Sequence, residues 1–220
     1  MSPIDSSHPG LRILLVGASG HVGRQVLGLA LADPRVAQVV APVRKSLPSH
    51  QKLVAPIIDF DALDRQAGWW NADAVICALG TTIRTAGSQA QFQKVDHGYP
   101  LAIARLAHAH GTRTFVLNSA LGADAQSRIF YNRVKGELEA DLEKIGFESL
   151  TFVRPGLIGG QREEFRLGER VMGAVLGVLG GVLPKRWRVN PPEAIAGELL
   201  EAAVSAPVGV HVVPSERMTR

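Results

Sequence analysis

Short runs of apolar, often β-branched residues alternate with longer stretches of helical periodicity along most of the chain. A run of roughly four to eight apolar residues is typical of a buried strand, whereas apolar residues that recur every three or four positions predict a helix. The first such pair is a strand over 11–16 and a helix over 21–32. Further strands are predicted at 36–43, 53–58, 72–79, 112–117, 150–153 and 208–213, and further helices at 88–110, 129–145 and 191–203.

This alternation predicts an α/β fold of the Rossmann type. Strands that are apolar along their whole length belong in a parallel sheet with both faces covered, and right-handed crossover helices provide that cover. Pro56 in the third strand favours a position near the edge of the sheet, because proline cannot donate to a neighbouring strand. We therefore expect a doubly wound parallel sheet with helices on both faces and a small C-terminal region on the substrate side.

The chain shows no repeat, low-complexity tract or linker that would divide it. We expect a flexible N-terminus over 1–10 and a single domain over 11–220. The least regular part, 156–190, lies where a substrate-side segment is expected. Within it, 171–183 is apolar but interrupted by glycines. Core packing or a hydrophobic substrate lid is the preferred interpretation, an oligomer interface such as a homodimer the second, and peripheral membrane contact the third.

Composition and charge narrow the class of protein. The sequence is 46% hydrophobic and 20% charged, as in globular proteins, and its basic residues are scattered although the net charge is +4. With only 5% aromatic residues, the chain is not expected to bind nucleic acid. No run approaches the ~18 apolar residues of a membrane span, and the polar N-terminus contains no signal core. We expect a cytoplasmic protein with no integral membrane segment and, because its seven histidines show no ligand spacing, no metal site.

A glycine-rich turn joins the first strand to the first helix. Such a turn needs a residue that tolerates positive φ, and a bound diphosphate needs backbone without side chains in its way. The helix that follows offers unpaired N–H groups and the positive end of its dipole to phosphate. This context favours a dinucleotide-binding loop over a turn that is merely rich in glycine. The predicted cofactor contacts in the loop are Gly17, Ser19, Gly20, His21, Val22 and Gly23.

The end of the second strand indicates which dinucleotide is bound. A carboxylate there would bind the adenosine ribose 2′-hydroxyl and repel a 2′-phosphate. The residues present are Arg44 and Lys45, with no acid. Arg44 can donate paired hydrogen bonds to a phosphate, which favours NADP over NAD, the alternative being that both cations are only surface charges. Asp59 and Phe60, after the third strand, are placed to flank the adenine.

Tyr131 and Lys135 lie one turn apart on the helix predicted over 129–145. A free tyrosine has a pKa of about 10, and a neighbouring ammonium lowers it. Ser119 ends the fifth strand, at the edge of a parallel sheet where ligands bind. We expect Tyr131 to transfer a proton, Lys135 to lower the tyrosine pKa and hold the nicotinamide ribose, and Ser119 to hydrogen-bond a carbonyl oxygen. A tyrosine and a lysine at this spacing are also common on a solvated helix. The succession of glycine loop, strand-end Ser119 and then Tyr131 with Lys135 is what favours a catalytic role.

In this order the landmarks resemble those of the short-chain dehydrogenase/reductase superfamily over roughly 11–158. The GxxGxxG loop and the turn Arg154-Pro155-Gly156 are similar to its extended and atypical branches. The run Gly80-Thr81-Thr82, with Val95-Asp96 and Val134-Lys135-Gly136-Glu137, is similar to the Tat-interacting-protein-like atypical group of NAD(P)-binding oxidoreductases.

The resemblance implies roles for particular residues. Ser119, Tyr131 and Lys135 would form the catalytic trio, with Tyr131 and Lys135 also contacting the cofactor. Asn118 stands where a second small hydroxyl residue is common in the family. The further implied cofactor contacts are Leu79, Gly80 and Thr81 on the adenosine and diphosphate side, Asn118, and Pro155, Gly156, Leu157 and Ile158 at the nicotinamide end.

Two functions are compatible with these features. The first is an NADP-dependent oxidoreductase of the carbonyl reductase or alcohol dehydrogenase type, acting on a small carbonyl or alcohol that is hydrophobic if 171–183 forms a lid. The second is an NADP(H)-binding redox sensor or regulatory protein with little or no turnover. Tyr131 and Lys135 favour the first, since a sensor does not need them, while the short C-terminal part favours the second.

Overall fold

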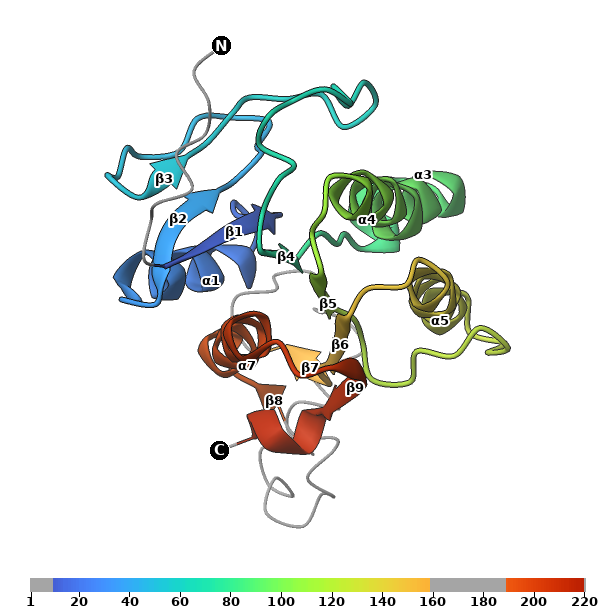
Figure 1. The fold of residues 1–220 in the computed structure, drawn as a ribbon. Coiled ribbons are helices and arrows are strands. Elements are labelled where there is room, and N and C mark those ends of the chain that lie inside the picture. The colour runs from blue at the N-terminus through green and yellow to red at the C-terminus, as the bar shows by residue number, and fades with distance from the viewer. Residues whose placement is uncertain (1–9, 159–188, 220) are drawn as a thin grey trace.

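The computed structural model describes residues 10–158 and 189–219, and a seven-stranded parallel sheet forms its centre (Figure 1). The strand order is β3-β2-β1-β4-β5-β6-β9, and every neighbouring pair is parallel. The predicted Rossmann-like α/β fold is therefore confirmed. The strands are β1 (Leu11–Val16), β2 (Val36–Val40), β3 (Leu53–Val54), β4 (Ala74–Cys77), β5 (Thr114–Asn118), β6 (Ser149–Arg154) and β9 (Gly209–Pro214), with β7 (Leu157–Ile158) and β8 (Val189–Asn190) as a separate parallel pair.

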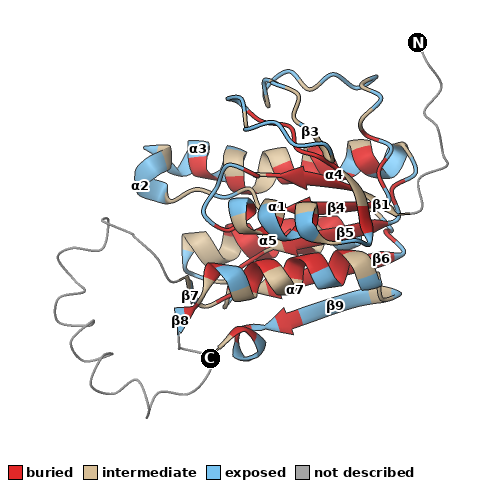
Figure 2. Cartoon of the chain, turned by 90° about the vertical axis from the view of Figure 1, so that its left-hand side faces the viewer, coloured by how far each residue is buried: buried red, intermediate tan, exposed pale blue. Residues whose placement is uncertain are grey.

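Helices cover both faces of the sheet. Successive strand residues point to opposite faces, so Ile13 and Leu15 of β1 pack toward α1 and α7, whereas Leu14 and Val16 pack toward α4 and α5. Figure 2 shows the buried residues concentrated on the strands and on the sides of the helices that face them. The helices are α1 (Gly23–Ala32), α2 (Ile83–Ala86), α3 (Gln89–Gln93), the π-helical turn η1 (Lys94–Gly98), α4 (Tyr99–Ala109), α5 (Phe130–Glu143), α7 (Pro192–Ser205) and the 3₁₀ turn η4 (Ser215–Met218).

The direction of strand addition reverses between β1 and β4. The chain proceeds from β1 outward to β2 and β3, and then returns to the other side of β1 as β4. In open parallel sheets, ligands bind at such a reversal, outside the carboxyl ends of the strands. Because Val16 pairs with Cys77, the segments that follow β1 and β4 leave the sheet side by side. The topology thus places the glycine loop at the predicted crevice.

The strand predicted over 53–58 is much shorter than expected. Only Leu53 and Val54 form β3, at the edge of the sheet as Pro56 indicates. Beyond them the chain pairs with its neighbour through an isolated bridge between Val43 and Ile57, and the Val43 N–H donates to the carbonyl of Pro56. Pro56 has no N–H to donate in return, so the regular ladder ends before it.

The helix predicted over 88–110 is present as a continuous helical run over 89–109, but a π-helical turn that was not predicted interrupts its α-helical geometry. The stretch forms α3, the π-helical turn η1 and α4 in succession, with the Tyr99 N–H donating to the carbonyl of Lys94. Pro100 explains the interruption, because it lacks the N–H that would bind the carbonyl of Asp96 and its ring crowds that carbonyl. One consequence is that Asp96 is buried within the fold.

Two predicted segments fall largely outside the described residues. The N-terminal segment 1–10 is described only at residue 10, and 159–188, which includes the apolar stretch 171–183, is not described. The residues on either side of 159–188 are held together, because β7 and β8 pair through Leu157 with Val189 and Ile158 with Asn190.

Candidate functional site

The glycine loop brings strand, turn and helix closer than any side chain would allow. Gly17 has a φ of +90°, and a Cβ on it would lie 2.7 Å from the carbonyl carbon of Ala78. A Cβ on Gly23 would lie 2.0 Å from the Gly17 carbonyl oxygen, and the Gly20 N–H donates to that same oxygen at 2.9 Å. Glycine is therefore required where β1, α1 and the segment after β4 converge.

The start of α1 fits the diphosphate of a dinucleotide. Within the described structure, Val22 provides no side-chain cap and the first helical turn contains no acidic residue. The N–H groups of residues 24–26 are bonded to the carbonyls of Gly20 and Val22. The N–H groups of Val22 and Gly23, just before them, have no backbone acceptor among the described residues and remain for an anion. Ser19 and His21 are exposed beside them. Arg24, which sequence reasoning did not select, is exposed in the first turn, with its guanidinium 3.3 Å from His21 Nδ1.

The predicted adenosine side lies beyond the ends of β1 and β2. Arg44 is exposed directly after the bridge residue Val43. Asp59 is exposed, and its carboxylate accepts a hydrogen bond from the backbone of Asp61. Phe60 is half-buried and lines a small gap together with Val16, Pro42 and Ile58. The gap is too small to hold a water molecule and therefore offers no room for a purine.

Lys135 forms a buried ion pair that the sequence did not predict. Its Nζ lies 2.8 Å from Asp96 Oδ1, and the two side chains are 4% and 1% exposed. The other Asp96 oxygen accepts the Thr81 N–H at 2.8 Å, so Asp96 ties α5 to the segment after β4. Burial lowers the pKa of Lys135, but Asp96 and Tyr131 oppose this strongly enough that the pKa is raised above its usual value. Lys135 is therefore an ammonium at neutral pH.

The backbone after β4 leaves little room around this pair. A Cβ on Gly80 would lie 3.4 Å from Asp96 Oδ1 and 4.0 Å from Lys135 Nζ. Leu79 and Thr81 are half-buried on either side of Gly80. The predicted contacts Leu79, Gly80 and Thr81 thus lie next to Lys135, beside the glycine loop.

Tyr131 lies in the first turn of α5 and is half-buried. Its ring packs against Phe92, with the ring centres 5.5 Å apart. Its hydroxyl has no hydrogen-bond partner among the described residues. One turn further along the same face, Lys135 is close enough for its pKa to be influenced by Tyr131. The arrangement presents a phenol with an available proton beside a buried ammonium.

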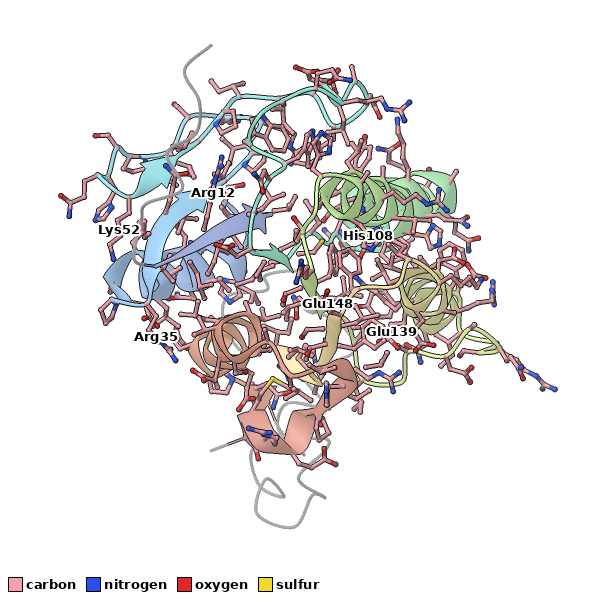
Figure 3. All side chains as sticks on the ribbon, in the orientation of Figure 1. Arg12, Arg35, Lys52, His108, Glu139 and Glu148 are labelled. Atoms are coloured by element: carbon pink, nitrogen blue, oxygen red, sulfur yellow. The ribbon has the colours of Figure 1, made fainter. Side chains whose placement is uncertain are left out.

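Ser119 is held by a second buried charge network rather than by Tyr131. Figure 3 labels the carboxylate residue of this network, Glu139, at helix α5. Its N–H donates to the Val153 carbonyl at the end of β6, and its hydroxyl donates to Glu139 Oε1 at 2.5 Å. The Arg154 guanidinium binds both oxygens of Glu139, through Nε at 3.1 Å and through Nη2. Hydrogen bonding to Glu139 raises the pKa of Arg154 above its usual value.

Asn118 and Ser119 face opposite sides of the sheet because side chains alternate along a strand. Asn118 Oδ1 is buried and has no hydrogen-bond partner in the described part of the chain, which leaves it available to a ligand donor. Its place at the carboxyl end of β5 fits a cofactor contact.

The turn Arg154-Pro155-Gly156, predicted to contact the nicotinamide end, is held by hydrogen bonds from two other segments of the chain. The Pro155 carbonyl accepts the Leu121 N–H at 2.7 Å, which fixes the turn beside the end of β5. The Gly156 N–H donates to Asn190 Oδ1 at 2.6 Å, and the amide of Asn190 donates to the Ser215 carbonyl at 3.0 Å. Ile158, in β7, is half-buried next to this turn. Asn190, also not anticipated from sequence, thus positions Gly156.

The structure therefore places most predicted residues at the carboxyl ends of the strands, but in two separate networks. Lys135, Thr81 and Gly80 meet at Asp96, close to Tyr131, while Ser119 meets Glu139 and Arg154. The spacing Lys135 to Glu139 repeats the spacing Tyr131 to Lys135, so all three residues lie along one face of α5. That repeat was the available sequence signal for Glu139.

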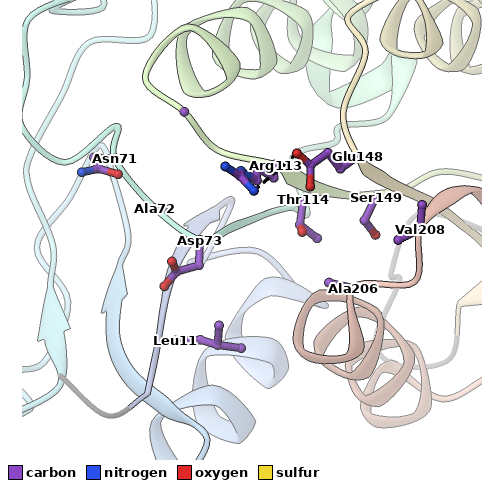
Figure 4. A pocket seen from close by; sticks show the side chains of 11 residues that line it. Leu11, Asn71, Ala72, Asp73, Arg113, Thr114, Glu148, Ser149, Ala206 and Val208 are labelled. Atoms are coloured by element: carbon purple, nitrogen blue, oxygen red, sulfur yellow. Dashed lines mark ion pairs between the residues drawn. The ribbon is translucent and has the colours of Figure 1, made fainter. Parts of the chain in front are cut away.

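A separate cavity of about 320 Å³ lies at the amino ends of the strands, the end of the sheet away from the glycine loop (Figure 4). It is lined by residues at the amino ends of β4, β5 and β6, among them Asp73, Arg113 and Glu148. Arg113 and Glu148 approach each other to 3.5 Å and are both largely exposed. The cavity does not belong to the crevice that contains Tyr131.

The described residues contain no group of three His, Cys, Asp or Glu side chains arranged to hold a metal ion. None of the helices in the described ranges is long and apolar enough to cross a membrane.

Comparison with known proteins is consistent with this geometry. Residues 17–169 match the model of a family described as NAD(P)H-binding. The chain is 33% identical to the mitochondrial protein fmp52 of Aspergillus clavatus over 217 residues, which cover 94% of this chain and 92% of that protein. It is 35% identical to the rat protein HTATIP2 over 180 residues, covering 80% and 72% of the two chains.

Solved structures share the fold at low sequence identity. MoeE5 in complex with UDP-glucose and NAD superposes with a TM-score of 0.71 at 14% identity, over 92% of this chain and 75% of that one. A short-chain dehydrogenase/reductase family oxidoreductase from Burkholderia thailandensis gives a TM-score of 0.67 at 18% identity, over 95% and 92% of the chains.

Proposed function

Because the chain belongs to the NAD(P)H-binding family of atypical short-chain dehydrogenase/reductases, we propose that it is an NADP-dependent carbonyl reductase or alcohol dehydrogenase. The observation that carries the proposal is that the Tyr131 hydroxyl, which has no hydrogen-bond partner among residues 10–158 and 189–219, lies one helical turn from the buried Lys135 ammonium. Through Asp96, Lys135 is tied to the segment after β4, beside the glycine loop. A reaction site and a dinucleotide site thus share one crevice.

The residues of the crevice would hold the dinucleotide along its length. The start of α1 would bind the diphosphate, Asp59 and Phe60 the adenine, and Gly156 with Asn118 the nicotinamide end. When bound, the cofactor supplies or accepts a hydride. The positions of these groups at the carboxyl ends of β1, β2, β5 and β6 support this assignment.

Charge supports NADP as the preferred cofactor. Arg44 is exposed after β2. Arg24 and His21 are exposed at the start of α1, where the phosphates of the dinucleotide would bind. A 2′-phosphate on the adenosine ribose would carry nearly two negative charges and accept hydrogen bonds from a guanidinium.

Tyr131 would move the proton in this mechanism. In reduction, its phenol O–H donates to the substrate carbonyl oxygen while the carbonyl carbon accepts the hydride, and in oxidation both transfers reverse. The Lys135 ammonium stabilises the negative charge that develops on the phenol oxygen when the proton leaves. Asp96 holds Lys135 in place through its 2.8 Å contact, so it acts as a positioning residue.

A redox sensor or regulatory role is the second candidate, and one observation favours it. Asp96 pairs directly with Lys135, so part of the electrostatic effect of the ammonium on Tyr131 is offset. A protein of this kind would bind NADPH and show little turnover.

The two candidates are separated by measuring NADPH binding and NADPH oxidation on the same preparation. Binding is followed by the fluorescence of NADPH, and oxidation by its absorbance with a panel of aldehydes and ketones. We expect both signals. Tight binding with no oxidation of NADPH by any member of the panel would instead support the sensor.

The cellular location is a separate proposal. We infer a cytoplasmic protein from its composition, whereas fmp52 relatives carry the description mitochondrial. Cell fractionation with a tagged full chain distinguishes the two, and a signal confined to mitochondria would contradict the cytoplasmic assignment.

A further inference from the structure

The cavity at the amino ends of the strands takes no part in the proposed oxidoreductase reaction. Its volume of about 320 Å³ is at the small end of the range for small-molecule pockets. Thr114, which begins β5, lines the cavity, whereas Asn118 ends the same strand at the proposed dinucleotide site. A strand of this length spans roughly 15 Å, so a ligand in the cavity would not meet the dinucleotide.

One wall of the cavity contains a hydroxyl without a partner. Thr114 is 6% exposed, and its hydroxyl forms no hydrogen bond with any residue in the described ranges. The adjacent hydroxyl, that of Ser149 on β6, also lacks a partner there but is sealed from solvent, whereas that of Thr114 is not. Figure 4 shows the Thr114 side chain between those of Asp73 and Ser149. A ligand in the cavity that bonds to the Thr114 hydroxyl would remove the cost of leaving a buried polar group unpaired.

Helix α7 ends at the same cavity, because its C-cap residue Ala206 is part of the wall. The Ala206 N–H donates to the Ala202 carbonyl, and no later carbonyl of the helix accepts a backbone N–H from the described residues. Pro207 contributes to this, since it has no N–H to offer. The last turn of this 14-residue helix also contains no basic residue. Its negative end, with unpaired carbonyls, therefore favours a cation that donates hydrogen bonds.

The charged side chains of the wall have the same polarity. Asp73 and Glu148 are carboxylates, and Arg113, the one guanidinium among the described lining residues, lies 3.5 Å from Glu148. Two carboxylates and one guanidinium leave the wall with a net negative charge. Asp73 Oδ2 accepts the Arg12 N–H at 2.7 Å, and the carboxylate retains lone pairs for a further donor.

The rest of the wall includes the apolar side chains of Leu11, Ala72, Ala206 and Val208. A ligand that combines a donor-rich cation with a small apolar body is complementary to both parts. We propose that this cavity is a binding site for a small primary amine in its ammonium form. The ammonium donates to the Thr114 hydroxyl and to the carbonyls at the end of α7, and the apolar body packs against the apolar wall. The site is independent of the dinucleotide and of the proposed oxidoreductase function.

The test compares three probes that share a phenyl group and a short chain. 2-Phenylethylamine carries an ammonium at pH 7, 2-phenylethanol is its neutral counterpart, and 3-phenylpropionate is an anion of similar size. Ligand-observed NMR titration gives the dissociation constants. We expect roughly 1–10 mM for 2-phenylethylamine, as suits so small a ligand. 2-Phenylethanol should bind at least about fivefold more weakly because it lacks the charge, and 3-phenylpropionate should not bind.

Three variants locate the amine within the cavity. Thr114→Val keeps the shape of the side chain and removes the hydroxyl, so binding should weaken by about fivefold to tenfold. Asp73→Asn keeps an acceptor for the Arg12 N–H but removes the charge, and binding should weaken by about twofold to fivefold. Val208→Trp should abolish binding, because Val208 is 85% exposed at the cavity and the larger side chain would occupy it. Glu193→Gln is the matched control: Glu193 is exposed in the first turn of α7, and the variant should bind like wild type.

The outcomes decide the proposal without reference to catalysis. No saturable binding of 2-phenylethylamine, or equal binding by wild type and Val208→Trp, would overturn it. Tighter binding of 3-phenylpropionate would overturn it in favour of an anion held by Arg113. Tighter binding of Nα-acetyl-lysine amide would overturn it in favour of a lysine side chain from a partner protein. If Thr114→Val fails to fold, Val208→Trp decides.

The dissociation constant of NADPH, measured on the same variants, keeps this proposal separate from the proposed function. It should equal the wild-type value in each variant, since the cavity and the dinucleotide site lie at opposite ends of the strands. A protein that binds the amine but does not oxidise NADPH would contradict the oxidoreductase alone.

Discussion

At the scale of single residues, the Lys135–Asp96 pair sets the electrostatics of the crevice. Removing an ammonium from water costs several kcal/mol, and a buried partner at close range offsets that cost. Here both side chains are almost fully buried and lie 2.8 Å apart, and the remaining carboxylate oxygen is satisfied by the Thr81 N–H. Loss of the carboxylate would leave a buried charge with no compensation.

Asp96→Ala should therefore reduce the free energy of unfolding by about 3–5 kcal/mol, as removal of one member of a buried ion pair does. The measurement is urea unfolding at pH 7. Glu148→Ala is the control, because it breaks the exposed 3.5 Å contact with Arg113 and should cost at most about 1 kcal/mol. Equal losses for the two variants would contradict the importance given to the buried pair.

The pH dependence of this pair follows from the direction of the pKa shift. The pKa of Lys135 is raised in the folded protein, so its stabilising contribution is fully present below the unfolded-state pKa of about 10.4 and is lost as pH rises through the folded pKa. In Asp96→Ala the ammonium has lost its partner and burial lowers its pKa, so the variant should become relatively more stable as pH rises from 7 to about 9 while wild type does not. The difference in unfolding free energy between the two should therefore shrink over that range, and a constant difference would contradict the stabilisation of the ammonium by Asp96.

At the scale of elements, α5 and the segment that precedes it are locked together at a glycine. A Cβ on Gly136 would lie 2.2 Å from the backbone of Asp124 and Ala125, and the Asp124 N–H also donates to the Asn132 carbonyl. These contacts connect Ser119, at the start of the segment, to Tyr131, at the start of α5. The relative placement of the two side chains depends on this packing.

Gly136→Ala should destabilise the protein by about 1–3 kcal/mol, because the new methyl group must displace backbone. Gly28→Ala is a matched control in the interior of α1, where a Cβ meets nothing within 4 Å, and it should raise stability by about 0.5–1 kcal/mol through its higher helix propensity. Thermal unfolding of both variants checks the pair. Stabilisation by both substitutions would rule out the close contact at Gly136.

At the scale of the whole molecule, the reversal of strand order between β1 and β4 marks the place where an open parallel sheet binds a ligand. Arg44 follows β2, and Tyr131 and Lys135 stand on α5. Continuously apolar strands and a glycine turn after β1 were sufficient to predict the parallel sheet and its helices on both faces, which Figure 1 shows. Their periodicity directly reflects burial on both sheet faces.

Arg44→Asp should weaken NADPH binding by at least about tenfold and leave NADH binding nearly unchanged, because it replaces a charge-assisted hydrogen bond to the 2′-phosphate by repulsion. Fluorescence titration gives both dissociation constants. Lys45→Asp, next to it, serves as the control for general surface charge. Equal losses for NADPH and NADH would contradict the role of Arg44.

Sequence patterns did not predict the buried carboxylates that contact the predicted catalytic side chains, Asp96 at Lys135 and Glu139 at Ser119. Asp96, which pairs with Lys135, lies in a π-helical turn just before Pro100, and helical periodicity does not encode such a turn. Glu139 lies one further turn along the face of Tyr131 and Lys135, but only the placement of Arg154 on β6 explains its burial. Long-range pairs of this kind depend on the register between elements.

The central claim is that Tyr131 transfers the proton, and one substitution tests it most directly. Tyr131→Phe keeps the ring that packs against Phe92 and removes only the hydroxyl. With NADPH and a ketone that wild type reduces, kcat should fall by about 10²–10⁴-fold while the dissociation constant of NADPH is unchanged. Retention of full kcat by Tyr131→Phe would contradict the assignment.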